Sequence, residues 1–410
     1  MSETLSGAEV RYHDFAAKLA QPGMREPVAA YLRWRQALER GEAASPPLRL
    51  APLSINLDLT TACNYACDHC IDWDTLNSPI RHEDEILRDS LRRLRRDGLR
   101  SVILIGGGEP TLYPGFLDMV AFLKEELGLQ VAVVSNGSRN DRLAEAAPLL
   151  EEGDWIRLSL DAGSDAVFQA MHRPRSRAVD LDRILESAGA IRRASPRPTL
   201  GFSFVIVWRG AHRDDAALVE NLGEMTLAAR RAREAGFDYI SFKPFLTRTP
   251  EGAEVLDPEE AEEAHERVLQ RIREQLEEAR ALETGDFRVL VSTNLRVLLS
   301  GDWRRYTRQP RVCHMQALRQ VLSPLGVFNC PAHRGVEHAR VGGRDAWAGE
   351  DPEARRGTVR ILDEFDASRE CREVTCLYHP VNWFLQGIVE EGRDPEEALG
   401  PEVDLGDAFL

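Results

Sequence analysis

Short runs of apolar, often β-branched residues alternate with longer amphipathic stretches between Ser54 and about Phe245. Such runs suit buried strands, and stretches with apolar residues at every third or fourth position suit helices. Because strand and helix alternate, we expect an α/β fold with a parallel sheet, in which binding groups gather at the carboxyl ends of the strands. The expected strands are 54–60, 101–106, 131–135, 155–160, 199–207 and 239–244. The expected helices are Ile86–Arg96, Phe116–Leu127, Leu181–Arg193 and Ala216–Ala235.

Three cysteines follow the first expected strand. Cys63, Cys67 and Cys70 have the spacing C-x3-C-x2-C within LDLTTACNYACDHCIDW. Thiolates this close on one loop can turn toward one inorganic centre, and cysteine clusters in intracellular enzymes are more often metal-binding than structural. Three ligands would leave one iron of a cubane cluster open to a small molecule. The alternatives are zinc, which usually takes four ligands, and buried thiols without a special role.

A glycine-rich turn follows the second expected strand. The apolar run 102–105 leads into Gly106, Gly107, Gly108 and Glu109. Glycine lets the backbone approach a ligand closely, and a carboxylate at a strand end can accept hydrogen bonds from an ammonium group. Three glycines alone more often form a turn than a binding site. This turn, however, comes one strand–helix unit after the cysteines, which favours a binding role.

The cysteine spacing and the glycine–glutamate motif together resemble the radical S-adenosylmethionine (SAM) superfamily. The resemblance implies a partial (β/α)6 barrel whose three cysteines hold a [4Fe–4S] cluster, with SAM chelating the fourth iron. It also implies that the turn containing Gly107, Gly108 and Glu109 holds the SAM amino group, and that His69 borders the adenine. An electron from a reductant such as flavodoxin or ferredoxin would cleave SAM to methionine and a 5′-deoxyadenosyl radical, which removes hydrogen from an unactivated carbon.

Polar residues at two later strand ends extend the implied SAM pocket. Asn136 follows the strand at 131–135, and Ser159 and Asp161 alternate onto one face of the next strand. A hydroxyl and a carboxylate there can bind the ribose diol, and similar strand-end residues do so in the family. The alternative is turn formation, because the sequences Asn-Gly and Asp-Ala-Gly-Ser favour turns without any ligand.

Four further cysteines form a second group: Cys313, Cys330, Cys371 and Cys376. Four is the number that a cubane ligated only by protein requires. An expected β-hairpin at 321–329 lies between the first two, and an apolar helix at 383–389 follows the last two. This arrangement resembles the twitch form of the SPASM domain and implies one auxiliary [4Fe–4S] cluster. Zinc is the alternative, since four thiolates also suit a structural zinc site. Three neighbouring histidines are expected to take no part: His314, His333 and His379.

We expect four regions along the 410 residues: an N-terminal helical extension at 1–50, the barrel at 51–250, a helical linker at 251–300 that contains the charged helix Asp257–Leu282, and the auxiliary domain at 301–410. The formal net charge of −15 argues against nucleic acid or an anionic membrane surface as the main partner. No run of about 18 apolar residues and no apolar signal segment is present. Seven cysteines without an export signal suit a reducing compartment, so we expect a cytoplasmic protein.

The resemblance leaves two substrate classes open. Twitch-bearing relatives act mostly on cyclitols, aminoglycosides and other sugars, and SPASM relatives act mostly on peptides or protein side chains. We expect a small polar substrate, because no separate peptide-recognition domain is visible, and dehydrogenation or epimerisation with help from the auxiliary cluster. Lys243 and Arg209 are the expected catalytic or substrate-binding cations, beside Asp72, Trp73 and His314. A non-catalytic iron–sulfur or zinc protein is a further alternative, against which the complete cysteine motif argues.

Overall fold

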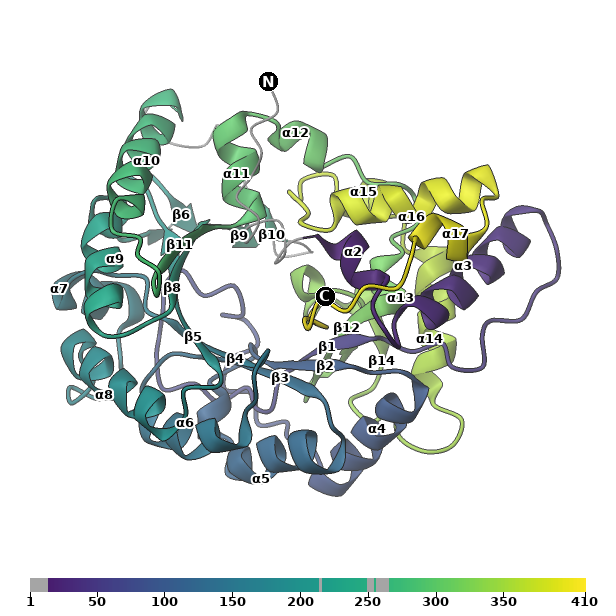
Figure 1. The fold of residues 1–410 in the computed structure, drawn as a ribbon, viewed down its shortest axis with the longest axis horizontal. Coiled ribbons are helices and arrows are strands. Elements are labelled where there is room, and N and C mark those ends of the chain that lie inside the picture. The colour runs from purple at the N-terminus through teal and green to yellow at the C-terminus, as the bar shows by residue number, and fades with distance from the viewer. Residues whose placement is uncertain (1–13, 214–215, 249–253, 256–264) are drawn as a thin grey trace.

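The computed structural model describes residues 14–213, 216–248, 254–255 and 265–410. One sheet organises them, with the strand order β11-β8-β5-β4-β3-β2-β1-β12-β13-β14. All pairs from β11 to β12 are parallel, and the pairs β12–β13 and β13–β14 are antiparallel. The sheet curves into the open barrel of Figure 1. Its strands are β1 (Ser54–Leu57), β2 (Ser101–Leu104), β3 (Gln130–Ser135), β4 (Trp155–Ser159), β5 (Thr199–Ile206), β8 (Tyr239–Pro244), β11 (Arg288–Val291), β12 (Arg319–Ser323), β13 (Gly326–Phe328) and β14 (Arg340–Gly342).

All six predicted strands are present, and consecutive ones lie side by side, which confirms the partial parallel barrel. Two further parallel strands extend it: β11, which the sequence did not reveal, and β12, which was predicted only as part of a hairpin. β11 pairs with β8 at one edge, and β12 pairs with β1 at the other, with Ser54 opposite Arg319. The predicted hairpin is β12–β13, and its first strand joins the barrel sheet beside β1. The sheet therefore runs across the predicted boundary at residue 300.

Helices cover the outer face of the barrel (Figure 1). On α4, Leu87, Leu91 and Leu94 recur at helical spacing and pack into the same core as the strand residues Val102 and Leu104. Residues that alternate with these core positions face the inside of the barrel. The helices are α4 (Asp84–Asp97), α5 (Phe116–Ala121, continued by a π-helical turn at Phe122–Glu126), α6 (Asn140–Ala146), α7 (Asp165–His172), α8 (Leu181–Ala194), α9 (Met225–Glu234) and α10 (His265–Arg280).

One predicted helix is wrong at its start. The stretch Ala216–Ala235 was expected to be helical throughout, but residues 216–217 form the short strand β7 opposite β6 (His212–Arg213), and α9 begins only at Met225. Asn221 explains the difference. Its side chain accepts a hydrogen bond from the Val207 backbone N–H and donates to the Asp161 and Val205 carbonyls, which holds this segment extended against β5. Most of the predicted charged helix is α10, and residues 257–264 lie outside the described residues.

The N-terminal helices pack on the C-terminal part of the chain. The helices α2 (Phe15–Leu19) and α3 (Arg25–Glu39) share a second apolar core with α16 (His379–Glu391) and α17 (Pro395–Leu399). Figure 1 shows α3 beside α16 and α17, away from the barrel helices. The remaining helices of this part are α11 (Thr293–Ser300), α12 (Trp303–Tyr306), α13 (Met315–Leu318), α14 (Glu353–Glu364) and α15 (Ala367–Glu370).

A C-terminal segment, residues 405–410, closes the barrel at the amino ends of its strands. Phe409 packs inside the sheet with Ile103 and Ala132, and Trp155 contacts its ring edge-on at 5.4 Å between centroids. Ser101 donates a hydrogen bond to the Ala408 carbonyl. Figure 1 accordingly places this end of the chain within the curve of the sheet.

Phe409→Ala is expected to lower the free energy of unfolding by about 3 kcal/mol, because it removes a buried aromatic ring and leaves a cavity. Urea denaturation followed by tryptophan fluorescence measures the change. The matched control is Val403→Ala, two residues before this segment, because Val403 is 46% exposed and its truncation should cost little. Equal stability of the two variants would show that the segment does not contribute to the core.

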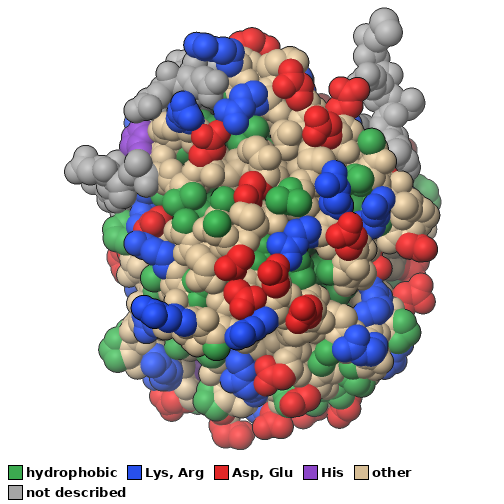
Figure 2. Space-filling model, turned by 90° about the vertical axis from the view of Figure 1, so that its left-hand side faces the viewer, with side chains coloured by type: hydrophobic (Ala, Val, Ile, Leu, Met, Phe, Trp, Pro, Cys, Tyr) green, Lys and Arg blue, Asp and Glu red, His purple; other side chains and the backbone are tan. Residues whose placement is uncertain are grey.

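The outer surface has mixed charge. Figure 2 shows basic and acidic side chains interspersed on the face that bears α9 and α10, with hydrophobic side chains in small separate groups. No basic stripe of the kind that binds nucleic acid is visible on this face. Among the helices of the described residues, none has the length and apolar character needed to cross a membrane.

Candidate functional site

The cysteine loop leaves β1 at the carboxyl edge of the sheet, and its three cysteines are partly buried. Burial and the neighbouring thiols raise the pKa of Cys67, and burial raises that of Cys70 to about 12. A zinc ion bound at about 2.3 Å would hold its sulfur ligands about 3.8 Å apart. In the described part of the chain, these three sulfurs do not form a group within 4.8 Å of one another. It is therefore the spacing C-x3-C-x2-C along the loop that favours a cluster.

His172 is a site residue that the sequence did not reveal. It comes from α7, and its Nδ1 lies 3.2 Å from the Cys67 sulfur while its Nε2 lies 2.9 Å from the Leu160 carbonyl oxygen. Burial lowers the pKa of His172 to about 4, so the ring is neutral at pH 7. Cys67, His69 and His172 place three ligand atoms within 4.8 Å of one another. No local motif marks this histidine, which lies more than 100 residues beyond the cysteine loop.

Two predicted cofactor-binding residues pair with each other. His69 Nε2 lies 3.1 Å from Asp161 Oδ2, and the other oxygen of this carboxylate accepts from the Val205 N–H at 2.7 Å. Burial alone would raise the pKa of Asp161, but the hydrogen bond with His69, together with His172 and Lys243 nearby, holds it below its usual value. The structure therefore brings the predicted residues His69 and Lys243, both partly buried, close to the buried Asp161 at the ends of β4 and β8.

Glu109 is buried and heavily hydrogen-bonded. Its Oε1 accepts from the Thr111 N–H at 3.0 Å and the Ser135 hydroxyl at 2.8 Å, and its Oε2 accepts from the Asn136 N–H at 2.7 Å. Burial raises the pKa of this carboxyl group. Asn136 in turn donates from its side chain to Asn64 in the cysteine loop at 2.9 Å. Because a carboxylate oxygen has about two lone pairs, Oε2 keeps room for one further donor. Ser159 lies near the end of β4, partly exposed.

The predicted glycines allow close approaches between parts of the protein itself. A Cβ on Gly107 would lie 3.1 Å from the Asp58 side chain, and one on Gly108 would lie 2.4 Å from the Ala62 carbonyl oxygen. The Glu109 N–H also donates to that carbonyl, at 2.8 Å. The glycine turn is thus packed directly on the cysteine loop, which holds Glu109 beside the cysteines.

The other predicted substrate residues are dispersed. Arg209 has a side chain that is 74% exposed and lies 3.7 Å from Glu220. Trp73 is 42% exposed beneath the Arg213 guanidinium. Asp72 forms a buried ion pair, described below. His314 is hydrogen-bonded to Tyr31 and Gln386 in the second core.

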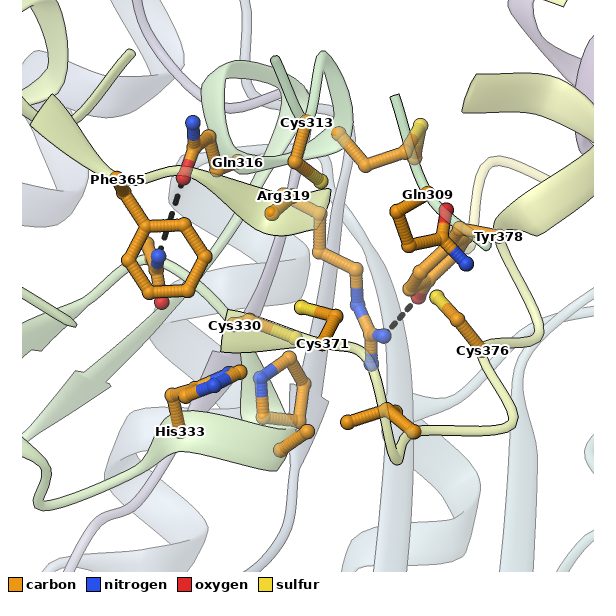
Figure 3. A pocket seen from close by; sticks show the side chains of 16 residues that line it. Gln309, Cys313, Gln316, Arg319, Cys330, His333, Phe365, Cys371, Cys376 and Tyr378 are labelled. Carbon is orange, nitrogen blue, oxygen red and sulfur yellow. Dashed lines mark hydrogen bonds between the residues drawn. The ribbon is translucent and has the colours of Figure 1, made fainter. Parts of the chain in front are cut away.

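The second group of cysteines surrounds one cavity (Figure 3). Burial and the neighbouring Cys330 raise the pKa of Cys313 to about 12, and burial with two neighbouring thiols raises that of Cys376. Arg319 also lines the cavity and is hydrogen-bonded to Tyr378 there and to Asn56 of β1 at 2.7 Å. Among the described residues, no three of these four sulfurs lie within 4.8 Å of one another. His333 belongs to the wall of this cavity, closer to the cysteines than the sequence suggested.

Comparison with known proteins identifies the region that contains the first cysteine group. Residues 57–222 match the Radical SAM superfamily. The chain contains a radical SAM domain. This domain spans all the strand ends at which the first group of predicted site residues lies, from Cys63 to Asp161. Such a domain uses a [4Fe–4S] cluster and SAM.

Curated relatives match part of the chain. An S-adenosylmethionine-dependent nucleotide dehydratase from Thermoplasmatales archaeon (strain ISO4-H5) is 33% identical over 154 residues, 37% of this chain and 52% of the relative. Mycofactocin maturase MftC of Mycobacterium ulcerans is 31% identical over 192 residues, 45% of this chain and 49% of the relative. The chain thus spans about half the length of these relatives.

A solved structure resembles the fold of this chain over more than the radical SAM domain. The structure of Streptococcus suis SuiB bound to S-adenosylmethionine superposes with a TM-score of 0.51, covering 87% of this chain and 75% of SuiB at 14% identity. At this identity the likeness concerns the fold alone.

Proposed function

We propose that this chain is a radical SAM enzyme that removes a hydrogen atom from a small polar substrate, and that its auxiliary cluster exchanges an electron with the resulting substrate radical, accepting it in dehydrogenation or supplying it in epimerisation. The observation that supports this most is the packing of the glycine turn on the cysteine loop, which places Glu109 beside the loop that carries the C-x3-C-x2-C motif. When bound, the cluster and SAM supply the 5′-deoxyadenosyl radical, and the protein supplies binding and orientation.

Each residue of the proposed site has a role that its surroundings allow. Glu109 accepts the SAM ammonium at Oε2. Asp161 and Ser159 lie where a ribose diol can bind, with His69 oriented by Asp161. Lys243, on the inner face of β8 near this carboxylate, can hold an anionic or hydroxylated group of the substrate. The C-terminal segment closes the opposite end of the barrel and limits the access of water to the radical.

The auxiliary site is proposed to hold a second [4Fe–4S] cluster rather than zinc. Four cysteines around one cavity satisfy a cubane completely. Zinc is the alternative, since four thiolates also suit a structural zinc site, and the neighbouring radical SAM domain favours the cluster. A fully ligated cluster has no iron free for substrate, so its role would be electron transfer, in dehydrogenation or epimerisation.

A small polar substrate is our first choice, and a peptide is the second. One relative is named a nucleotide dehydratase and another a mycofactocin maturase, so related domains are associated with both classes. The polar strand ends, with Ser159 and Asp161 at β4 and Lys243 on β8 on either side of β5, favour a compact hydroxylated molecule. Lys243 and Arg209 remain proposals for substrate contacts.

SAM cleavage by anaerobically reconstituted protein tests the proposal. With a strong reductant, 5′-deoxyadenosine and methionine should form together. Deuterium from labelled sugars, cyclitols or nucleotides should then enter 5′-deoxyadenosine when the right class is supplied. Transfer from a peptide alone would replace the small-molecule assignment, and a failure to cleave SAM would refute the radical reaction.

Glu109→Gln is expected to weaken SAM binding about tenfold or more, because a hydrogen bond to a charged group contributes about 1.5–3 kcal/mol. The amide keeps the size of the side chain, so iron content should not change. Equilibrium dialysis of SAM against the reconstituted protein measures the affinity. The matched control is Glu126→Gln, an exposed carboxylate paired with Arg92 on the outer surface. Unchanged affinity of the Glu109 variant would exclude this residue from the SAM site.

A further inference from the structure

A buried ion cluster joins the two cysteine groups. Arg334 follows Cys330 by four residues and reaches across to the first cysteine loop. Its Nε lies 2.9 Å from Asp58 Oδ2, and its Nη1 lies 2.8 Å from Asp72 Oδ1. The three side chains are almost completely buried, with exposed fractions of 4% for Arg334, 0% for Asp58 and 7% for Asp72.

The two carboxylates flank the first cysteine loop. Asp58 follows β1 directly at the start of the loop, and Asp72 comes two residues after Cys70. The Asp72 backbone makes a hydrogen bond to the Cys70 sulfur, and the Asp72 carboxylate accepts from the Gly107 N–H at 3.3 Å. Asp72 is therefore a direct connection between a cluster ligand and the glycine turn that leads to Glu109.

Gly106 makes room for the arginine. A Cβ at this position would lie 2.5 Å from Arg334 Nη2, and the backbone has φ +76°, which other residues rarely adopt. The first glycine of the turn is thus explained by an arginine from the auxiliary region. The Arg334 side chain thus lies against the glycine turn and pairs with Asp58, before the cysteine loop, and with Asp72, after it.

The charges make this contact hard to replace. Two buried carboxylates share one guanidinium, and burial raises the pKa of Asp58 to about 7 although Arg334 acts in the opposite direction. Removing the arginine would leave two buried carboxylates without their cation, which is far more costly than the loss of an exposed ion pair. The loop and the turn would then separate or take up water.

We propose that Arg334 is a positioning residue for the radical SAM site, through which the auxiliary region fixes the cysteine loop and the glycine turn in the arrangement that binds SAM. This inference rests on the proposed function. It gives the segment after Cys330 a second role that is independent of electron transfer, because Arg334 acts on SAM binding whether or not the auxiliary site exchanges electrons.

Anaerobic equilibrium dialysis of SAM with reconstituted full-length protein tests this role, together with kcat and KM for 5′-deoxyadenosine formation. Arg334→Gln should keep its iron and bind SAM at least about tenfold more weakly, because the cysteine loop and the glycine turn lose the cation that holds them together. The defect should appear in KM for SAM more than in kcat. Arg334→Lys, which retains the charge but not the fork, should recover part of the affinity.

The matched control is Arg344→Gln. Arg344 joins the same two regions at the surface, through Glu83 at 2.7 Å, and does not contact the cysteine loop or the glycine turn. Its variant should bind SAM like the wild type. If Arg334→Gln loses iron, the combined variant Asp58→Asn, Asp72→Asn, Arg334→Met replaces the charged set by neutral groups of similar size. This variant should fold, hold iron and still bind SAM weakly.

Two results would overturn the inference: an iron-replete Arg334→Gln or neutral variant with wild-type SAM affinity, or an equal loss in Arg344→Gln. A different result would refute the proposed function. If the wild type forms no 5′-deoxyadenosine, the radical reaction itself is refuted, whereas wild-type cleavage with an unaffected Arg334 variant refutes only the positioning role.

Discussion

Replacing Cys63, Cys67 and Cys70 together by alanine is expected to abolish the formation of 5′-deoxyadenosine. The three thiolates are the only protein ligands proposed for the cluster that delivers the electron to SAM. Without them neither the electron donor nor the open iron is present. Chromatography of anaerobic reactions with SAM and a strong reductant measures the product. Any fold defect is excluded if the variant keeps the absorption of the auxiliary cluster.

Continued SAM cleavage by the triple cysteine variant would contradict the assignment. If the triple variant still forms 5′-deoxyadenosine at a rate near that of the wild type, the first cysteine group is not the site of SAM cleavage. The second group, around the cavity of Figure 3, would then have to be reconsidered as the catalytic centre.

Replacing Cys371 and Cys376 by alanine is expected to stop product formation while SAM cleavage continues. Cys330 is left intact because it lies four residues from Arg334, and replacing Cys330 would risk disturbing the first site as well. The wild type should bind about eight irons, four for each cubane, and the variant should lose half. Deuterium from labelled substrate should still enter 5′-deoxyadenosine, but no oxidised product should appear.

Two results distinguish the alternatives for the auxiliary site. Metal analysis that finds zinc in the wild type, with only four irons, would show a structural zinc site. Normal turnover of the Cys371 and Cys376 variant would show that the second group has no part in electron transfer, and the dehydrogenase assignment would fail.

The barrel could be predicted because its strands are short apolar runs separated by amphipathic helices, a pattern that depends only on neighbouring residues. The pairing of β12 with β1 could not, because it joins residues 265 positions apart and periodicity does not specify a partner. The late start of α9 has a similar cause. Asn221 is an ordinary polar residue in the sequence, and only contacts with β5 show that it holds the segment extended.

Part of the candidate site could likewise be predicted from the sequence, and part could not. The first cysteines and Glu109 could be predicted because their spacing along one loop or one turn is itself the signal. His172 and Arg334 could not, because each reaches the cysteine loop from a separate element. The glycine turn was predicted for the approach of a ligand, and the structure adds a second reason for its glycines, since Asp58 and Arg334 occupy the space that side chains there would need.

The electron paramagnetic resonance spectrum of the reduced wild-type protein, frozen before and directly after SAM is added, tests most directly whether two clusters exist and only one is open to SAM. We expect two [4Fe–4S] signals, of which SAM changes one, and this change should be absent when Cys63, Cys67 and Cys70 are replaced. A spectrum that SAM leaves unchanged, or in which SAM alters both signals, would contradict the assignment.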